Sequence, residues 1–172
     1  ELEPASLLDV GTGSGAIALA AAAELPGCEV VATDLSPAAL EVAAANARRL
    51  GLERRVRFER GTLPGAGRFE LLLANLPYVG DGEWRRLAPE ISEHEPREAL
   101  VSGEDGLAAN RSLLEALGPG GGAAVEVGSV ALEVGEGQAP EVAAMVAAAG
   151  FAEVDRRRDL AGIERCVVGR GR

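Results

Sequence analysis

The stretch ELLLANLPYVG, residues 70–80, ends an apolar run with an amide, a proline and a phenol. The side chain of Asn75 offers one hydrogen-bond acceptor and two donors. The carbonyl of Leu76 precedes Pro77, so Leu76 is pushed to an extended conformation and the turn is stiff. Together the Asn75 side chain and the Leu76 carbonyl form a fixed pair of acceptors for a planar –NH2 group, beside the aromatic wall of Tyr78. Such a pair would aim the nitrogen lone pair of an amide or an exocyclic amine at a methyl donor, so that orientation supplies much of the rate.

A second pattern, LDVGTGSGAIALA at residues 8–20, places three glycines between a strand and a helix. Glycine lets the backbone turn sharply, and a nucleotide-like ligand can then lie across the N-terminus of the helix. Asp34, which ends the next strand, can accept hydrogen bonds from both ribose hydroxyls. Two cofactors fit this geometry. A dinucleotide requires G-x-G-x-x-G or G-x-G-x-x-A, and the second pattern begins here at Gly11. S-adenosylmethionine would instead place its ammonium group near Asp9.

Strand and helix signals alternate along the chain, which predicts an α/β fold with an open, mostly parallel, doubly wound sheet. Ser36 and Pro37 suit the start of a helix, and Gly51 suits its end. Two repeats, VEVG at 125–128 and LEVG at 132–135, leave the end of the fifth strand open. The expected strands are 6–10, 29–35, 55–61, 69–75, 123–135, 151–160 and 165–170, the last two forming a closing hairpin with an antiparallel C-terminal strand. The expected helices are 15–25, 36–50, 107–117 and 139–149.

The candidate site residues gather at one edge of this sheet, because ligands of doubly wound sheets bind outside the carboxyl ends of the strands. We therefore interpret the turn after the fourth strand as a substrate site rather than as an ordinary turn with a capping asparagine. The candidate catalytic residues are Asn75, Leu76, Pro77 and Tyr78. The candidate cofactor-binding residues are Asp9, Gly11, Thr12, Gly13, Gly15, Asp34, Leu35, Thr62 and Asn75.

The composition indicates a folded domain with an acidic surface. The 172 residues suit one domain with a sizeable core, and 47% of them are apolar, which argues against disorder. No run approaches the roughly 20 apolar residues of a membrane span, and we find no signal peptide. A net charge of −10 argues against a nucleic-acid partner, and the arginines at 156–158 are interpreted as an exposed strand. Cys28 and Cys166 lack metal-ligand spacing, so we expect free thiols and a cytoplasmic location.

These motifs together resemble the class I S-adenosylmethionine-dependent methyltransferases, and among them the release-factor glutamine methyltransferases. The glycine turn is shared by many methyltransferases. Much more specific is the combination of LLLANLPYV with LAPEISEHEPREALVSGEDGL and DLAGIERCVVGR, and the resemblance covers nearly the whole chain. It implies a seven-stranded, Rossmann-like sheet, S-adenosylmethionine as the cofactor and S-adenosylhomocysteine as the product.

The resemblance also implies a substrate, which is the glutamine side-chain amide of the Gly-Gly-Gln tripeptide in peptide-chain release factors. Carried over by position, Asn75 and the Leu76 carbonyl would hold this amide, while the glycine turn and Asp34 would hold the cofactor. Residues 95–97, Glu-Pro-Arg, look like the family's second signature, in which we assign Arg97 a structural role.

Three features depart from the family pattern. Leu76 replaces the first proline of the usual Asn-Pro-Pro-Tyr, and Asn-Leu-Pro-Tyr also occurs in ribosomal RNA adenine dimethylases. Thr62 stands where family members commonly carry an acid near the adenine amine. The family's N-terminal helical domain is absent, so we expect residues 1–172 to form a single catalytic methyltransferase domain.

Two alternative functions stay open because of these departures. A nucleic-acid adenine methyltransferase could use the same amide clamp, although the net charge of −10 and the 3% of aromatic residues weigh against it. A fragment or paralogue that binds the cofactor without catalysis is the second. A nicotinamide dehydrogenase fits less well, since no residue is placed as an acid for hydride transfer.

Overall fold

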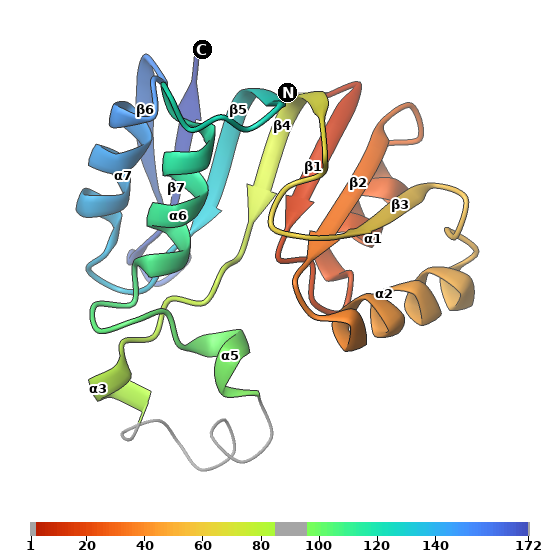
Figure 1. Ribbon diagram of the computed structural model, residues 1–172, viewed down its shortest axis with the longest axis horizontal. Coiled ribbons are helices and arrows are strands. Elements are labelled where there is room, and N and C mark those ends of the chain that lie inside the picture. Colours follow the sequence, from red (N-terminus) through yellow and green to blue (C-terminus); the bar gives the residue numbers. More distant parts are fainter. Residues whose placement is uncertain (1–2, 85–95, 172) are drawn as a thin grey trace.

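The computed structural model describes residues 3–84 and 96–171. Seven strands within these residues form one sheet with the order β3-β2-β1-β4-β5-β7-β6 (Figure 1). Strands β1 to β5 run parallel, and β7 runs antiparallel to both β5 and β6. The predicted doubly wound sheet with an antiparallel C-terminal strand is confirmed. The strands are β1 Ser6–Val10, β2 Glu29–Asp34, β3 Val56–Arg60, β4 Gly67–Ala74, β5 Val125–Glu133, β6 Glu153–Arg158 and β7 Glu164–Arg170.

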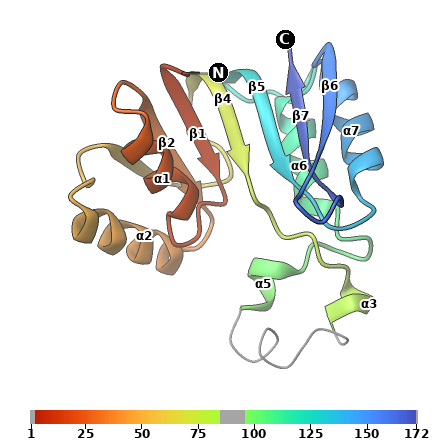
Figure 2. The same cartoon turned by 180° about the vertical axis from the view of Figure 1, so that it is seen from behind.

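Helices pack on both faces of the sheet. In Figures 1 and 2, α6 and α7 cover the half of one face formed by β4 to β7, and α1 and α2 cover the other face over β1 to β3. Two short helices, α3 and α5, project beyond the carboxyl ends of the parallel strands (Figure 1), and the sequence patterns did not predict them. The helices are α1 Ala16–Glu24, α2 Pro37–Leu50, α3 Asp81–Trp84, α5 Arg97–Leu100, α6 Ala108–Leu117 and α7 Ala139–Ala148.

The ends of α2 follow the predicted local chemistry. The hydroxyl of Ser36 accepts a hydrogen bond from the Ala39 N–H at 3.3 Å, and Pro37 occupies the first turn. Gly51 ends the helix with φ at 69°, a left-handed conformation that favours glycine. This helix therefore begins and ends where the sequence indicated.

Long-range pairing decides where β5 ends. The strand runs through the whole first repeat and stops at Glu133, inside the second repeat. Its pairing with β4 continues to Leu132, and its pairing with β7 continues to Glu133. The two repeats are locally equivalent, so only the lengths of the neighbouring strands could select between them.

Three apolar side chains on adjacent strands form the centre of the core. Leu8, Leu72 and Val130 lie level with one another in the register of β1, β4 and β5. All three are completely buried, in the cluster that also packs against α6 and α7. The continuously apolar β4 thus lies at the middle of the sheet, as a central parallel strand requires.

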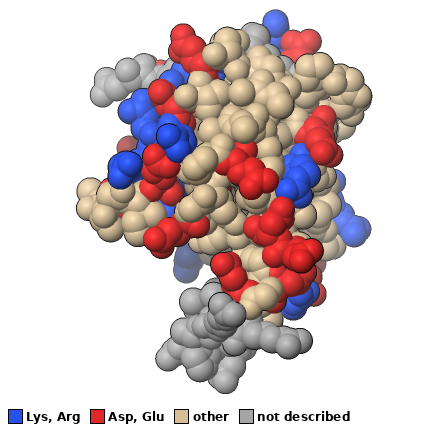
Figure 3. Space-filling view, turned by 90° about the vertical axis from the view of Figure 1, so that its left-hand side faces the viewer, with Lys and Arg blue, Asp and Glu red and all other residues tan. Residues whose placement is uncertain are grey.

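The predicted arginine run is an ion-paired strand at the edge of the sheet. Arg156 and Arg158 both pair with Glu164, at 3.1 and 3.7 Å. Arg157 pairs with Asp155 at 3.2 Å. Figure 3 shows basic and acidic side chains interspersed on one face of the molecule, without a continuous basic surface there. Exposed pairs of this kind contribute at most about 1 kcal/mol each.

Two further observations concern the cysteines and the lengths of the helices. Cys28 is buried and Cys166 is half-buried, and both are free. Within the residues that the structure describes, no helix is long and apolar enough to cross a membrane.

Leu72→Ala should lower the free energy of unfolding by about 2–5 kcal/mol, because the deletion leaves a cavity between β1 and β5. Urea unfolding followed by circular dichroism measures the change. The matched control is Leu160→Ala, since this leucine is fully exposed and its truncation should change stability by no more than about 0.5 kcal/mol. Equal losses for the two variants would contradict the assignment of the core.

Candidate functional site

The register of the central strands brings the predicted site residues together. Val10, the last residue of β1, lies level with Thr33 of β2 and with Ala74 of β4. The residues that follow these positions are Gly11, Asp34 and Asn75. The glycine turn, the acid and the amide therefore leave the sheet side by side at its carboxyl edge.

The glycine turn is held against β2 by its backbone. The N–H groups of Gly11 and Thr12 both donate to the Thr33 carbonyl at 2.9 Å. Gly11, Gly13 and Gly15 all have positive φ, which makes glycine the favoured residue at each position. A Cβ added at Gly13 would have no heavy atom within 4 Å. The turn therefore presents an open surface of backbone at the N-terminus of α1.

Asp34 joins the glycine turn to the start of α2. One carboxylate oxygen accepts from the Gly13 N–H at 2.9 Å, and the other accepts from the Ser36 N–H at 2.8 Å. Each oxygen keeps a second lone pair that can accept from a ligand hydroxyl. The carbonyl of Thr62 accepts from the Thr33 hydroxyl at 2.9 Å, and Leu35 is 68% exposed. The predicted cofactor residues at the ends of β2 and β3 thus form one rim.

Asp9 lies beneath the glycine turn, with only 1% of its surface exposed. One carboxylate oxygen accepts from the Thr12 hydroxyl at 2.6 Å and from the Ala18 N–H at 3.1 Å. The other oxygen has no hydrogen-bond partner within the described part of the chain. Desolvation by burial raises the pKa of this carboxyl, and the bonds from Thr12 and Ala18 oppose the rise only in part. The structure therefore shows Asp9 tying the turn to the first residues of α1.

The turn after β4 rests on the glycine turn through Leu76. A Cβ added at Gly11 would come within 2.8 Å of the Leu76 Cδ2 atom. Leu76 is 8% exposed, and its side chain occupies the space beside Gly11 that a Cβ would otherwise take. Asn75 is exposed, and its side chain forms no hydrogen bond within residues 3–84 and 96–171. The Asn75 side chain is therefore exposed at the carboxyl edge of the sheet, beside the glycine turn.

The remaining residues of this turn contact loops from later in the chain. The Tyr78 carbonyl accepts from the side chain of Gln138 at 2.9 Å, and the Tyr78 ring lies against Gly135. Pro77 is half-buried. Sequence reasoning missed Gln138. The one local hint is that a glutamine occupies the N-cap position of α7, where Ser, Thr, Asp or Asn is preferred. Sequence reasoning also missed Asn46, which donates to the Ser14 carbonyl at 2.9 Å and holds the glycine turn from α2.

The second predicted signature lies beside the short helices. The Arg97 guanidinium forms an ion pair with the carboxylate of Asp81, which joins α5 to α3. The structural role expected for Arg97 stays a prediction. Glu95 lies outside the described residues.

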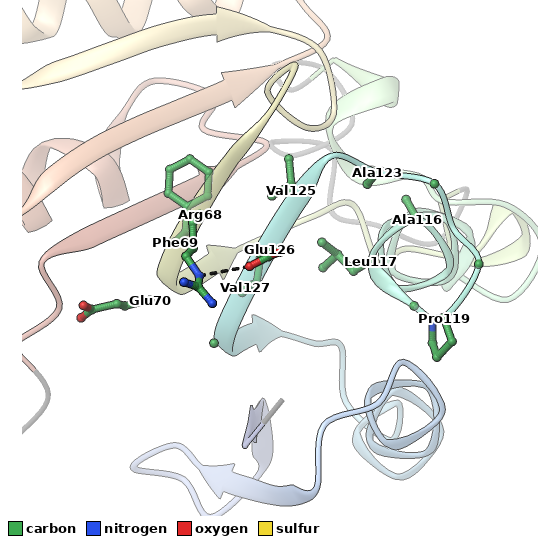
Figure 4. Close-up of a pocket in the computed structure, with 14 residues that line it drawn as sticks. Arg68, Phe69, Glu70, Ala116, Leu117, Pro119, Ala123, Val125, Glu126 and Val127 are labelled. Atoms are coloured by element: carbon green, nitrogen blue, oxygen red, sulfur yellow. Dashed lines mark ion pairs between the residues drawn. The ribbon is translucent and has the colours of Figure 1, made fainter.

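A cavity of about 730 Å³ lies at the opposite edge of the sheet, near the amino-terminal ends of β4 and β5 (Figure 4). It is bordered by the glycine-rich loop 118–122 and by the exposed ion pair of Arg68 with Glu126 at 3.0 Å. No buried side chain with an unpaired polar atom lines it, so its size does not make it the site. No group of His, Cys, Asp and Glu side chains in the described part of the chain could hold a metal ion.

The sheet order, the glycine turn and the acid after β2 define the class I fold of S-adenosylmethionine-dependent methyltransferases. A methyltransferase from Pyrococcus furiosus superposes with a TM-score of 0.67 at 19% identity, over 95% of this chain and 73% of that chain. The structure of PigF with SAH superposes with a TM-score of 0.60 at 18% identity, over 98% of this chain and 51% of that chain. These similarities concern the fold.

The family assignment comes from the sequence. A family model described as a methyltransferase domain matches residues 7–94, and the chain belongs to this family. The release factor glutamine methyltransferase of Rhodospirillum rubrum is 40% identical over 96% of this chain. That of Bordetella pertussis is 46% identical over 92% of it. The resemblance read from the motifs is confirmed, and membership of a methyltransferase family decides against a nicotinamide dehydrogenase. The chain spans 51% and 58% of the lengths of these two relatives.

Asp9→Asn should make the protein more stable at pH 7.5, because it removes a buried charge while its amide oxygen can still accept from Thr12 and Ala18. Folding raises the pKa of Asp9, so the folded state holds the carboxyl proton more tightly than the unfolded chain does. The wild-type carboxylate therefore lowers stability above the raised pKa, and this loss disappears as the pH falls toward about 4. Urea unfolding of both proteins across this range measures the difference, and a difference independent of pH would contradict the prediction.

Proposed function

We propose that this chain is the methyl-transferring part of a protein-glutamine methyltransferase. It would use S-adenosylmethionine to methylate the glutamine side-chain amide of the Gly-Gly-Gln motif in peptide-chain release factors. The observation that carries this proposal is the exposed amide of Asn75, level with Gly11 and Asp34 at one edge of the sheet.

The residues at this edge fit the proposed cofactor. Asp34 keeps lone pairs for the two ribose hydroxyls, and the open backbone at Gly13 leaves room for the chain that carries the sulfonium. Leu35 offers exposed apolar surface beside them, on which an adenine ring would pack. Thr62 and Thr12 complete the rim and the turn. When bound, S-adenosylmethionine supplies an electrophilic methyl group on a positively charged sulfur, a good leaving group.

The turn after β4 would hold the substrate amide. One N–H of the substrate –NH2 group would donate to the Asn75 side-chain oxygen, and the other would donate to the Leu76 carbonyl. Pro77 would keep that carbonyl in place, and Tyr78 would border the pocket. Held in this way, the amide nitrogen faces the cofactor edge without an acid–base residue, so the protein acts by positioning and by excluding water.

Support for this substrate comes from the relatives. Both are named release factor glutamine methyltransferase, and the similarity to each extends beyond the glycine turn over more than nine-tenths of this chain. The relatives are longer, so their whole activity belongs to longer proteins. The Asn75 turn and the cofactor edge both lie within the part that this chain shares with them.

Incubation of the purified chain with methyl-labelled S-adenosylmethionine and a release factor should place label on the glutamine of the Gly-Gly-Gln motif. Mass spectrometry locates the label, and a release factor with this glutamine changed to alanine is the control. Ribosomal RNA in a parallel reaction separates the two substrate classes.

The outcomes of this assay distinguish the functions. Label on RNA adenine, with none on the release factor, would favour the adenine methyltransferase. Cofactor binding by calorimetry without transfer to either substrate would favour a binding domain without catalysis. Either result contradicts the proposal.

Asn75→Ala should lower kcat/KM by roughly 100-fold or more, since one of the two acceptors for the amide is lost from the transition state. The Kd for S-adenosylmethionine should stay near the wild-type value, because the Asn75 side chain holds no part of the glycine turn. Steady-state kinetics and calorimetry measure the two effects. Equal loss of turnover and of cofactor binding would show that Asn75 is not the substrate clamp.

The reciprocal control is Asp34→Ala. This change removes the acceptor for the ribose and also releases Gly13 and Ser36. Cofactor affinity should therefore fall first, by about tenfold or more. The two variants together separate the substrate side of the site from its cofactor side.

A further inference from the structure

Gln138 connects three loops at the carboxyl edge of the sheet. Its side-chain oxygen accepts from the Gly135 N–H at 2.9 Å, in the loop that follows β5. Its side-chain nitrogen donates to the Tyr78 carbonyl at 2.9 Å and to the Asp105 carbonyl at 3.3 Å. Only this orientation of the amide satisfies one N–H donor and two carbonyl acceptors, so the hydrogen bonds fix which atom is the nitrogen.

The position of Gln138 makes this use of its side chain unusual. It is the N-cap residue of α7, where a polar side chain commonly accepts from the first N–H groups of the helix. Its side chain makes no such bond, and a proline occupies the first turn of α7. The amide is directed instead toward the loop that carries Asn75, Leu76 and Tyr78.

The loops approach one another closely there, and a Cβ at Gly106 or Gly80 would collide with a backbone carbonyl. A Cβ added at Gly106 would lie 2.2 Å from the Tyr78 carbonyl oxygen and 2.7 Å from the Gln138 nitrogen. A Cβ added at Gly135 would lie 2.8 Å from the Gln138 oxygen. One at Gly80 would lie 2.7 Å from the Glu104 carbonyl oxygen. Glycines at positions 106 and 135 therefore let the backbone of two loops come close to the Gln138 side chain.

Backbone hydrogen bonds of the next residue, Val79, also hold the turn after β4. The Val79 N–H donates to the Leu100 carbonyl at 2.8 Å, and the Ser102 N–H donates to the Val79 carbonyl at 2.9 Å. The Ser102 hydroxyl in turn accepts from the Ala109 N–H at 2.7 Å, in the first turn of α6. The turn after β4 is thus held by Leu76 against Gly11 at one end, and by Val79 and Gln138 at the other.

We infer that Gln138 is a positioning residue for methyl transfer, which acts by fixing the Tyr78 carbonyl and, through it, the direction of the Asn75 and Leu76 acceptors. This inference rests on the proposed function of the turn. The hydrogen bonds of the Gln138 side chain all go to protein backbone, so we assign it no direct contact with substrate or cofactor. Its donor nitrogen is the essential atom, because the carbonyl oxygens of Tyr78 and Asp105 both accept hydrogen bonds from it.

Two substitutions separate the donor from the acceptor. Gln138→Glu keeps the shape and the acceptor for Gly135, but it loses the donor and sets a carboxylate oxygen against the carbonyls of Tyr78 and Asp105. Gln138→Met keeps most of the volume and loses both functions. Glu136→Gln is the matched control, because it makes the reverse exchange at an exposed residue of the same loop.

We expect Gln138→Glu and Gln138→Met to lower kcat by about tenfold or more, since small displacements of a positioned group cost this much. The Kd for S-adenosylmethionine should change by less than about twofold, because the glycine turn and Asp34 are untouched. Steady-state methylation of a release factor and calorimetry give the two values. Amide hydrogen exchange, followed by mass spectrometry, should become faster in segment 76–80 in both variants, and Glu136→Gln should match the wild type in every measurement.

The outcomes separate this inference from the proposed function. Unchanged exchange in segment 76–80 overturns the inference, as does wild-type kcat in Gln138→Glu or a loss of cofactor affinity as large as the loss of kcat. If the wild-type chain transfers no methyl group to the release factor, the proposed function fails, while hydrogen exchange still tests whether Gln138 fixes the turn. Should Gln138→Glu not fold, Gln138→Met gives the same readouts without the added charge.

Discussion

The absence of a side chain at residue 11 is the constraint on which this site depends. Leu76 packs closely against the turn after β1 where Gly11 has no side chain, since a Cβ there would approach the Leu76 Cδ2 atom to 2.8 Å. The contact joins the turn after β4 to the turn after β1, and the two strands lie side by side in the sheet.

Polar groups beneath the surface complete this arrangement. Asp9 and Asp34 organise the glycine turn from below and from the side, and Gln138 secures the Asn75 turn from the opposite end. None of these groups lies on a long helix or in the middle of a strand. Asp34 and Gln138 hold backbone N–H or carbonyl groups of loops, which have no partners from regular secondary structure and must be satisfied in another way. Asp9 holds the Thr12 hydroxyl and the Ala18 N–H at the start of α1. The loops at this edge are therefore fixed by side chains as well as by backbone hydrogen bonds, whereas the sheet is fixed by its own ladder.

Much of the fold could be predicted from the chain alone. The strands that were expected at 6–10 and 29–35 and the helix that begins at Pro37 agree with the structure to within about one residue, because apolar runs, Ser36 and Gly51 carry local signals. The end of β5 could not be predicted, since it depends on how far β4 and β7 extend. The short helices α3 and α5 have too few residues to show a period, so no pattern marked them.

The sequence by itself determined the types of residue at the site, the cofactor class that they suit and the order in which they follow the strands. Local chemistry suffices for this, because glycine turns, caps and the proline after Leu76 act over a few residues. Only the tertiary structure decided that β1 lies between β2 and β4, that Gly11 contacts Leu76, and that a glutamine from the start of α7 bonds to Tyr78. These relations join residues far apart in the chain, and they arise when the sheet and its helices pack. The physical reason is that register and loop contacts are set by the burial of the whole core rather than by any one segment.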